Sequence, residues 1–204
     1  MNIIHYAEDD HKQKFEHKAW GIANYCFGGI VDFPSFFVAD AINKKGLLLA
    51  IDGDELAGIA GYSKLEGRQE LEQLNQIIKF CLEPTLHKEQ DTKQVAEEYN
   101  VPIEKVEWVP SPNSFSCYSP MNDDIVFTIM AVMPHYRGRG IGKRLMEERI
   151  NIARQGETSA IFAWCYERGP SIEVHRSFGF EPIFRQKPFY RDGEGCTIMG
   201  LKLK

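Results

Sequence analysis

The sequence predicts an α/β protein of the α+β type, in which helices flank both faces of a mixed sheet. Two apolar runs on either side of Asp52-Gly53-Asp54 predict an antiparallel strand pair over 46–65, because Asp-Gly between such runs is typical of a hairpin. The nearly continuous apolar runs 124–133 and 159–166 predict strands covered on both faces. Helical patterns alternate with these strands, which predicts a sheet with helices packed on it.

The elements in the first hundred residues follow from periodicity and composition. Residues 3–6 predict a short first strand, and the polar pattern over 9–25 predicts a helix. Residues 26–42 are apolar and aromatic. Leu and Ile at helical spacing predict a helix over 69–83, and a second, polar helix is predicted over 88–99.

The middle of the chain is interpreted as an insertion. The stretch 109–123 is rich in Pro, Ser and Asn, which predicts a loop or an irregular edge strand. Residues 66–120 together are too short and too polar to bury much core of their own. Because 204 residues of which 43% are apolar suit one compact domain, we expect a single domain over 1–204 that carries this insertion.

The C-terminal elements complete the predicted sheet. Apolar positions predict a helix over about 140–155 and a short helix over 169–180 that ends at Gly179. The apolar run 197–203 predicts the last strand.

Charge and composition restrict the function. A net charge of −5 and a pI near 5.7 argue against general nucleic-acid binding. No apolar run approaches the length of a membrane span, and the first residues do not resemble a signal peptide. Five scattered cysteines without a CxxC pair indicate reduced thiols. We therefore expect a cytoplasmic protein with no membrane or nucleic-acid partner and, since no metal-ligand spacing is present, no metal.

The most informative stretch is AVMPHYRGRGIGKRL, residues 131–145, between a predicted strand and a predicted helix. Free N–H groups at a helix N-terminus attract anions, and glycines let a phosphate approach them closely. Arg and Lys add charge-assisted hydrogen bonds. The residues predicted to hold the anion are Arg137, Gly138, Arg139, Gly140, Ile141, Gly142 and Lys143.

Two common phosphate loops do not fit this stretch. A P-loop needs Ser or Thr after its Gly-Lys pair and Gly five positions before the second Gly, but Arg144 and Arg137 stand there. A dinucleotide loop needs GxGxxG, and the glycine spacing here is GxGxG.

The residues VMPHYRGRGIGKRLM resemble the main motif of the GCN5-related N-acetyltransferase (GNAT) family, written roughly V-x-P-x-x-R-G-x-G-I-G-x-x-L. The resemblance extends to the predicted strand pair, to HRSFGFEPI over 175–183 and to CTIMGLKL at the end. It implies a mainly antiparallel sheet and acetyl-CoA as the acyl donor. It also implies a primary amine acceptor, on a small molecule or a protein, and it is compatible with a homodimer.

The resemblance assigns roles to further residues. A strand bulge at Met130, Ala131 and Val132 would offer a backbone N–H to the thioester carbonyl. Asp124 lies thirteen residues before Arg137, where one branch of the family has its general base. His175 stands where a Tyr usually protonates the departing thiolate, and Ser171 keeps a small residue against CoA. For both Asp124 and His175 the alternative is a purely structural role.

The resemblance also implies where the acceptor binds, because the first helices and their loop line that site in the family and the apolar segment 26–42 would occupy this place. Phe27, Phe33, Phe36 and Phe37 would then surround an ammonium held by Asp32 or Asp40. The alternative is ordinary core packing. Because His175 and Arg168 replace residues usual in the family, a non-catalytic acyl-CoA sensor is an alternative function. Transfer of a longer acyl group is another.

Overall fold

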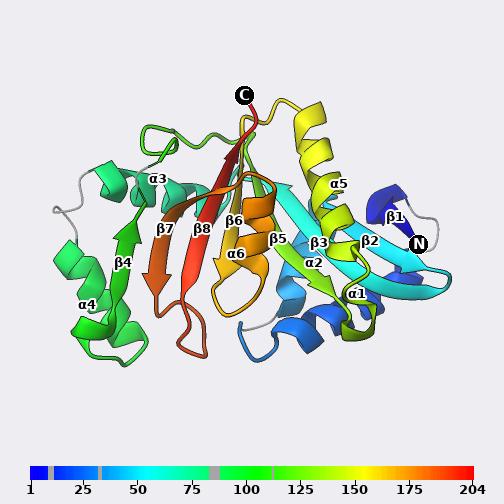
Figure 1. Ribbon diagram of the computed structural model, residues 1–204, viewed down its shortest axis with the longest axis horizontal. Helices are drawn as coiled ribbons and strands as arrows, with labels where there is room; N and C mark the ends of the chain where they lie inside the picture. Colours follow the sequence, from blue (N-terminus) through cyan, green and yellow to red (C-terminus); the bar gives the residue numbers. More distant parts are fainter. Residues whose placement is uncertain (9–11, 32–33, 83–87, 112) are drawn as a thin grey trace. The chain divides into compact units, whose positions relative to one another are not determined.

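The computed structural model describes residues 1–8, 12–31, 34–82, 88–111 and 113–204 (Figure 1). They form two compact units, one of Met1–Lys64 with Ile125–Thr158 and one of Leu65–Asp124 with Ser159–Lys204. None of the helices in these ranges is long and apolar enough to cross a membrane.

The first unit is built on four antiparallel strands in the order β1-β2-β3-β5. They are β1 (Asn2–His5), β2 (Leu47–Asp52), β3 (Glu55–Lys64) and β5 (Ile125–Val132). The predicted hairpin is confirmed: Asp52 pairs with Glu55 across a two-residue turn in which Gly53 has a φ of 62°. Glycine suits this backbone because other residues are strained at positive φ.

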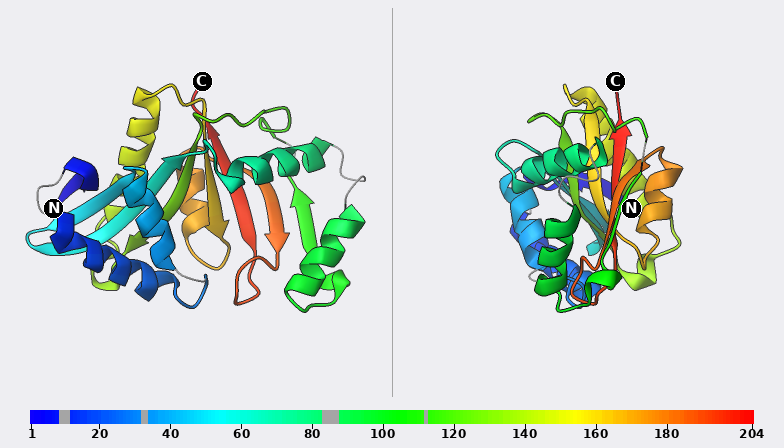
Figure 2. Two further views of the ribbon diagram at one scale, coloured as in Figure 1. Left: turned by 180° about the vertical axis from the view of Figure 1, so that it is seen from behind. Right: turned by 90° about the vertical axis from the view of Figure 1, so that its left-hand side faces the viewer.

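Helices cover both faces of this unit's sheet (Figures 1 and 2). Helices α1 (Lys12–Phe27) and α2 (Pro34–Asn43) pack on one face, and α5 (Ile141–Gln155) packs on the other. Alternation along β2 accounts for this, since Leu47 and Leu49 join the α1/α2 core whereas Leu48 joins the α5 core. Short 3-10 helices follow β1 (Tyr6–Glu8) and β5 (Pro134–Tyr136).

The second unit contains four more antiparallel strands in the order β6-β8-β7-β4. They are β6 (Ala160–Tyr166), β8 (Cys196–Lys202), β7 (Glu181–Lys187) and β4 (Glu107–Pro110). Its helices are α3 (Gln69–Leu82), α4 (Lys88–Glu98) and α6 (Ser171–Ser177), with a 3-10 turn at Ile103–Lys105. Figure 2 shows α3 on the face opposite to α6.

Most of the predicted elements are present. The helices over 69–83, 88–99 and 140–155 agree with the structure to within a residue or two, and the mainly antiparallel sheet is confirmed. Helix α2, strand β7 and the short 3-10 helices were not predicted. The segment 66–120, predicted to hold little core, provides the edge strand β4 and buried Leu74 and Phe115.

Candidate functional site

The glycine loop joins β5 to α5 and leaves the start of the helix open. Gly138 and Gly140 have φ of 76° and 75°, and a Cβ at either position would meet no atom within 4 Å. The glycines are therefore required by backbone conformation and not by crowding. Gly140 is the N-cap of α5, and no side chain in the described part of the chain caps this helix. The first N–H groups of α5 thus face an open approach that suits an anion.

Basic side chains surround this helix start. Arg137 donates from Nε to the carbonyl of Val132 at 3.0 Å, which fixes the loop to the end of β5. Arg139 lies over the ring of Tyr136 at 5.1 Å from its centroid. Among the described residues, Lys143 pairs with Glu147 at an exposed i,i+4 position, 3.8 Å apart, and such pairs contribute little. Arg139 and Lys143 therefore remain available to a phosphate group.

The end of α1 lies close to this loop. An Nη2 atom of Arg137 is 4.0 Å from the Sγ of Cys26, which precedes Phe27. Burial raises the pKa of the Cys26 thiol, although the charge of Arg137 opposes that effect. Phe27 packs on the α1/α2 core, whereas Phe36 is 63% exposed. Of the predicted acceptor residues, these two are thus in different environments, and Asp32 and Phe33 lie outside the described residues.

The bulge expected at Met130–Val132 lies earlier on the side facing β3. Gly61 pairs with Ile129 but Tyr62 pairs with Phe127, so Thr128 is the extra residue of β5. From Ile129 to Val132 the pairing with β3 is regular. The role of the backbone N–H groups over 130–132 stays a prediction.

Asp124, the predicted base, is 0% exposed at the end of the loop before β5. The hydroxyl of Tyr118 contacts both carboxylate oxygens, at 2.9 and 2.8 Å. The N–H groups of Met121 and Ala160 donate to the same carboxylate, each at 2.9 Å. These contacts fill most of its acceptor capacity, and Asp124 joins the loop before β5 to the start of β6.

His175, the predicted acid, is 5% exposed in α6. Its Nδ1 lies 2.7 Å from the carbonyl of Ser171 and 3.4 Å from Cys165 Sγ. The carbonyl is an acceptor only, so Nδ1 carries a proton. In the neutral ring Nε2 then carries none, and His175 can donate from Nε2 only as imidazolium.

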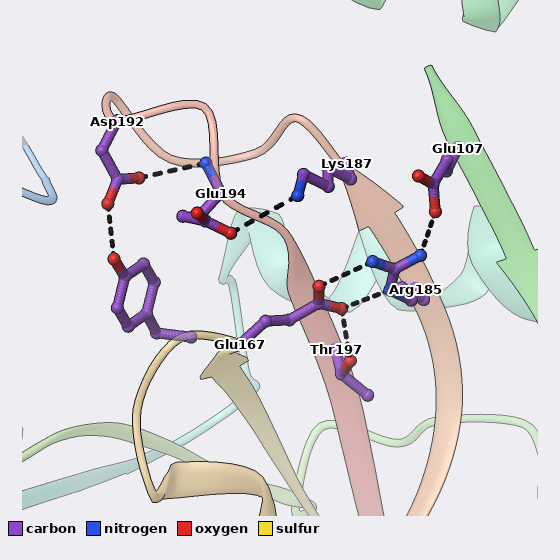
Figure 3. Close-up of polar contacts among 8 residues, drawn as sticks. Glu107, Glu167, Arg185, Lys187, Asp192, Glu194 and Thr197 are labelled. Carbon is purple, nitrogen blue, oxygen red and sulfur yellow. Dashed lines mark hydrogen bonds and ion pairs between the residues drawn. The ribbon is translucent and has the colours of Figure 1, made fainter. Parts of the chain in front are cut away.

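Sequence reasoning missed a second polar cluster, which joins β4, β7, β8 and the turn after β6 in the second unit (Figure 3). Arg185 of β7 donates to the Glu167 carboxylate from Nε at 2.6 Å and from Nη2 at 2.9 Å, and it also bonds to Glu107 of β4. Thr197 of β8 donates to Glu167 at 3.0 Å. Burial alone would raise the pKa of Glu167, but these hydrogen bonds outweigh burial and hold the pKa below its usual range.

The loop between β7 and β8 extends this cluster. Lys187 pairs with Glu194 at 3.5 Å (Figure 3). The hydroxyl of Tyr166 donates to Asp192. The bond to Asp192 raises the pKa of Tyr166. Glu107, Glu167 and Glu194 pair with cations, whereas Asp192 accepts hydrogen bonds from Tyr166 and the Glu194 N–H. Because these groups bond to one another, we interpret the cluster as a structural clamp. Within the described residues no group of three or more His, Cys, Asp or Glu side chains is placed to hold a metal.

Comparisons with known proteins agree with the geometry. A family model described as the acetyltransferase (GNAT) family matches residues 22–180. The comparison with curated proteins gives no match.

Solved structures share the fold at low identity. The ribosomal-protein-S18-alanine N-acetyltransferase from Escherichia coli is 14% identical, with a TM-score of 0.58 over 100% of this chain and 94% of that one. A structure of the NatC complex bound to Gag peptide and CoA matches at 13% identity, with a TM-score of 0.64 over 100% of both chains. A Drosophila melanogaster polyamine N-acetyltransferase that forms N-acetylagmatine is 13% identical, with a TM-score of 0.57 over 99% of this chain and 100% of that one.

Proposed function

The chain belongs to the acetyltransferase (GNAT) family and is an acetyl-CoA-dependent N-acetyltransferase, and from this premise we propose that it transfers the acetyl group to a primary amine by direct attack. The observation that carries the proposal is the start of α5 beside Gly138 and Gly140, which no side chain of the described residues caps. Its N–H groups would bind the pyrophosphate of CoA, with charge-assisted bonds from Arg139 and Lys143. Ser171 would leave room for the cofactor at the start of α6.

The chemistry requires an oxyanion donor and a base. The amine nitrogen attacks the thioester carbon, the C–N bond forms, and the C–S bond then breaks to release CoA. A backbone N–H within 130–132 would stabilise the negative oxygen formed on attack. An alkyl ammonium has a pKa of about 10.4, so removal of its proton at pH 7 costs about 4–5 kcal/mol. A base that accepts this proton contributes about 10²–10⁴ in rate.

We propose that Asp124 acts as that base through Tyr118. The Tyr118 hydroxyl donates a hydrogen bond to the Asp124 carboxylate. Its oxygen keeps a lone pair that can accept a proton from the amine or from a bridging water as the hydroxyl proton moves to Asp124. Burial, followed by the bond to Asp124, raises the pKa of Tyr118 above its usual range. The phenol is thus protonated at neutral pH and ready to donate. His175 as imidazolium would protonate the thiolate.

The acceptor is proposed as a small-molecule or protein amine. Two of the fold neighbours are named for a ribosomal-protein alanine and for a polyamine, so both classes belong in the first panel. Phe27 and the exposed Phe36 would contact the acceptor. Succinyl-CoA in the same panel tests the alternative of a longer acyl group.

The test is release of free CoA thiol from acetyl-CoA, with agmatine and an Ala-initiated peptide as amines. We expect turnover with one class, and a loss of kcat of about 10²–10⁴ in Asp124→Asn with a parallel loss in Tyr118→Phe. The matched control is Tyr99→Phe, since that hydroxyl donates to the Phe189 carbonyl in the same unit. Folded Asp124→Asn with wild-type kcat would contradict the role of Asp124. CoA binding without turnover of any amine would contradict the proposed reaction.

A further inference from the structure

Helix α5 carries a fully buried arginine on its apolar face. Arg149 is 1% exposed and stands at helical spacing with Leu145, Met146 and Ile150, which are also buried. Burying a guanidinium is costly unless hydrogen bonds offset the loss of water. An aliphatic residue would pack on the sheet at no such cost, so its contacts should show what the arginine provides.

The contacts of Arg149 converge on the bulge of β5. Its Nη1 lies 3.2 Å from the carbonyl oxygen of Gly61 and 3.5 Å from that of Ile129. These two residues form the last regular pair before the register shift at Thr128. Its guanidinium carbon lies 3.9 Å from the centroid of the Phe127 ring, on the other side of the shift. The Arg149 side chain therefore contacts residues on both sides of the register shift between β3 and β5.

The bulge itself is closely fitted. A Cβ on Gly61 would lie 2.5 Å from Thr128 Oγ1 and 3.1 Å from Ala41 Cβ, so glycine is required at this point of β3. The extra residue also resets the alternation of β5. Phe127 and Met130 both contact Arg149 although they are three residues apart, whereas such residues face opposite sides of a regular strand.

The changed alternation of β5 after Thr128 affects the backbone that would bind the thioester. Successive N–H groups of a strand point to opposite edges, so the extra residue determines which amides among Met130, Ala131 and Val132 point away from β3. We propose that Arg149 is a positioning residue: it holds the bulge and thereby fixes the backbone N–H that binds the thioester carbonyl. This inference rests on the proposed function.

The experiment follows the carbonyl directly, by infrared difference spectra of [1-¹³C]acetyl-CoA bound without acceptor. Arg149→Met removes the hydrogen bonds but keeps a side chain of similar length. Arg149→Lys keeps the charge and provides a second variant if the first does not fold. Leu145→Ala is the matched control, because Leu145 is fully buried on the same helix and packs in the α5 core. The affinity for CoA and kcat are measured on each folded variant.

In wild type and Leu145→Ala the carbonyl band of bound acetyl-CoA should lie at a lower frequency than that of free acetyl-CoA in solution. In Arg149→Met it should return toward that frequency, with kcat lower by about tenfold or more and CoA affinity within about threefold of wild type. The carbonyl band and kcat of Arg149→Lys should lie between those of wild type and those of Arg149→Met.

Three results would count against the inference, and they are distinguishable. An Arg149→Met band and kcat like those of wild type would overturn the role of Arg149 and leave the proposed function standing. A wild-type band at the solution frequency, with acetyl-CoA bound, would overturn the assignment of the oxyanion donor and this inference with it. Failure of wild type to bind acetyl-CoA would overturn the proposed function itself.

Discussion

The start of α5 and the Glu167–Arg185 cluster are both rich in polar groups, but they use them in opposite ways. In the cluster Arg185 donates to both Glu167 and Glu107, and Thr197 also donates to Glu167 (Figure 3). At the start of α5 no described side chain caps the helix, and Gly140 leaves the approach open. The difference teaches that a ligand site is found where the fold leaves hydrogen-bonding groups unused, and a clamp where it has used them.

The largest expected effect comes from closing the open helix start. Gly140→Asp would place a carboxylate where we expect the pyrophosphate, and CoA affinity should fall by about 100-fold or more, which is about 2.7 kcal/mol. The control is Gly67→Asp, because Gly67 also has a positive φ, 63°, and open space around its Cβ position. Calorimetric titration with CoA checks both variants.

The two glycine variants should have similar unfolding midpoints, since each places the same side chain in the same backbone region. If Gly140→Asp bound CoA as tightly as Gly67→Asp does, the start of α5 would not be the cofactor site and the contrast between the two regions would fail.

The next effect is on stability and comes from opening the clamp. Arg185→Met leaves Glu167 and Glu107 without their shared donor, so the free energy of unfolding should fall by about 2 kcal/mol. CoA affinity should not change. Arg176→Met is the control, because Arg176 pairs with Glu173 at an exposed i,i+3 position and should cost at most about 0.5 kcal/mol. Urea unfolding measures both; equal effects would show that the clamp contributes no more than a surface pair.

The smallest effect is a pH dependence. Because the pKa of Glu167 is lowered in the folded protein, its contribution to stability is fully present above the unfolded pKa of about 4.3. It is lost as the pH falls through the lower folded value. Glu167→Gln should therefore flatten the stability profile below about pH 4.3 relative to wild type. Urea titrations at pH 3, 4 and 5 check this, and parallel profiles would argue against a charged Glu167.

Local pattern made the place of the glycine loop between β5 and α5 predictable from the sequence. Its glycines, its basic residues and the strand and helix around it are contiguous, so each could be placed before any contact was known. The clamp could not be predicted in this way, because Glu107 and Arg185 are 78 residues apart and strand β7, which carries Arg185, mixes charged and apolar residues.

Arg149 and Asp124 show what sequence pattern alone does not predict about a buried polar residue. Arg149 stands at helical spacing with the buried apolar residues of α5, so the pattern indicates that it faces the sheet. The pattern does not indicate the bulge of β5 that Arg149 contacts. Asp124 was identified by its spacing from Arg137, whereas its bonds to Tyr118 and Ala160 depend on how the chain returns to it in space. Spacing thus proposed a role for Asp124 and packing defined the partners through which it would act.

The most direct test of the central claim is a titration of ¹⁵N-labelled protein with CoA, with ATP as a comparison ligand. The account predicts that the largest shifts of backbone amide signals occur within Gly138–Lys143, that CoA causes them at lower concentration than ATP, and that the amide of Gly67 does not move. Tight CoA binding with the amides of Gly138–Lys143 unmoved would contradict it.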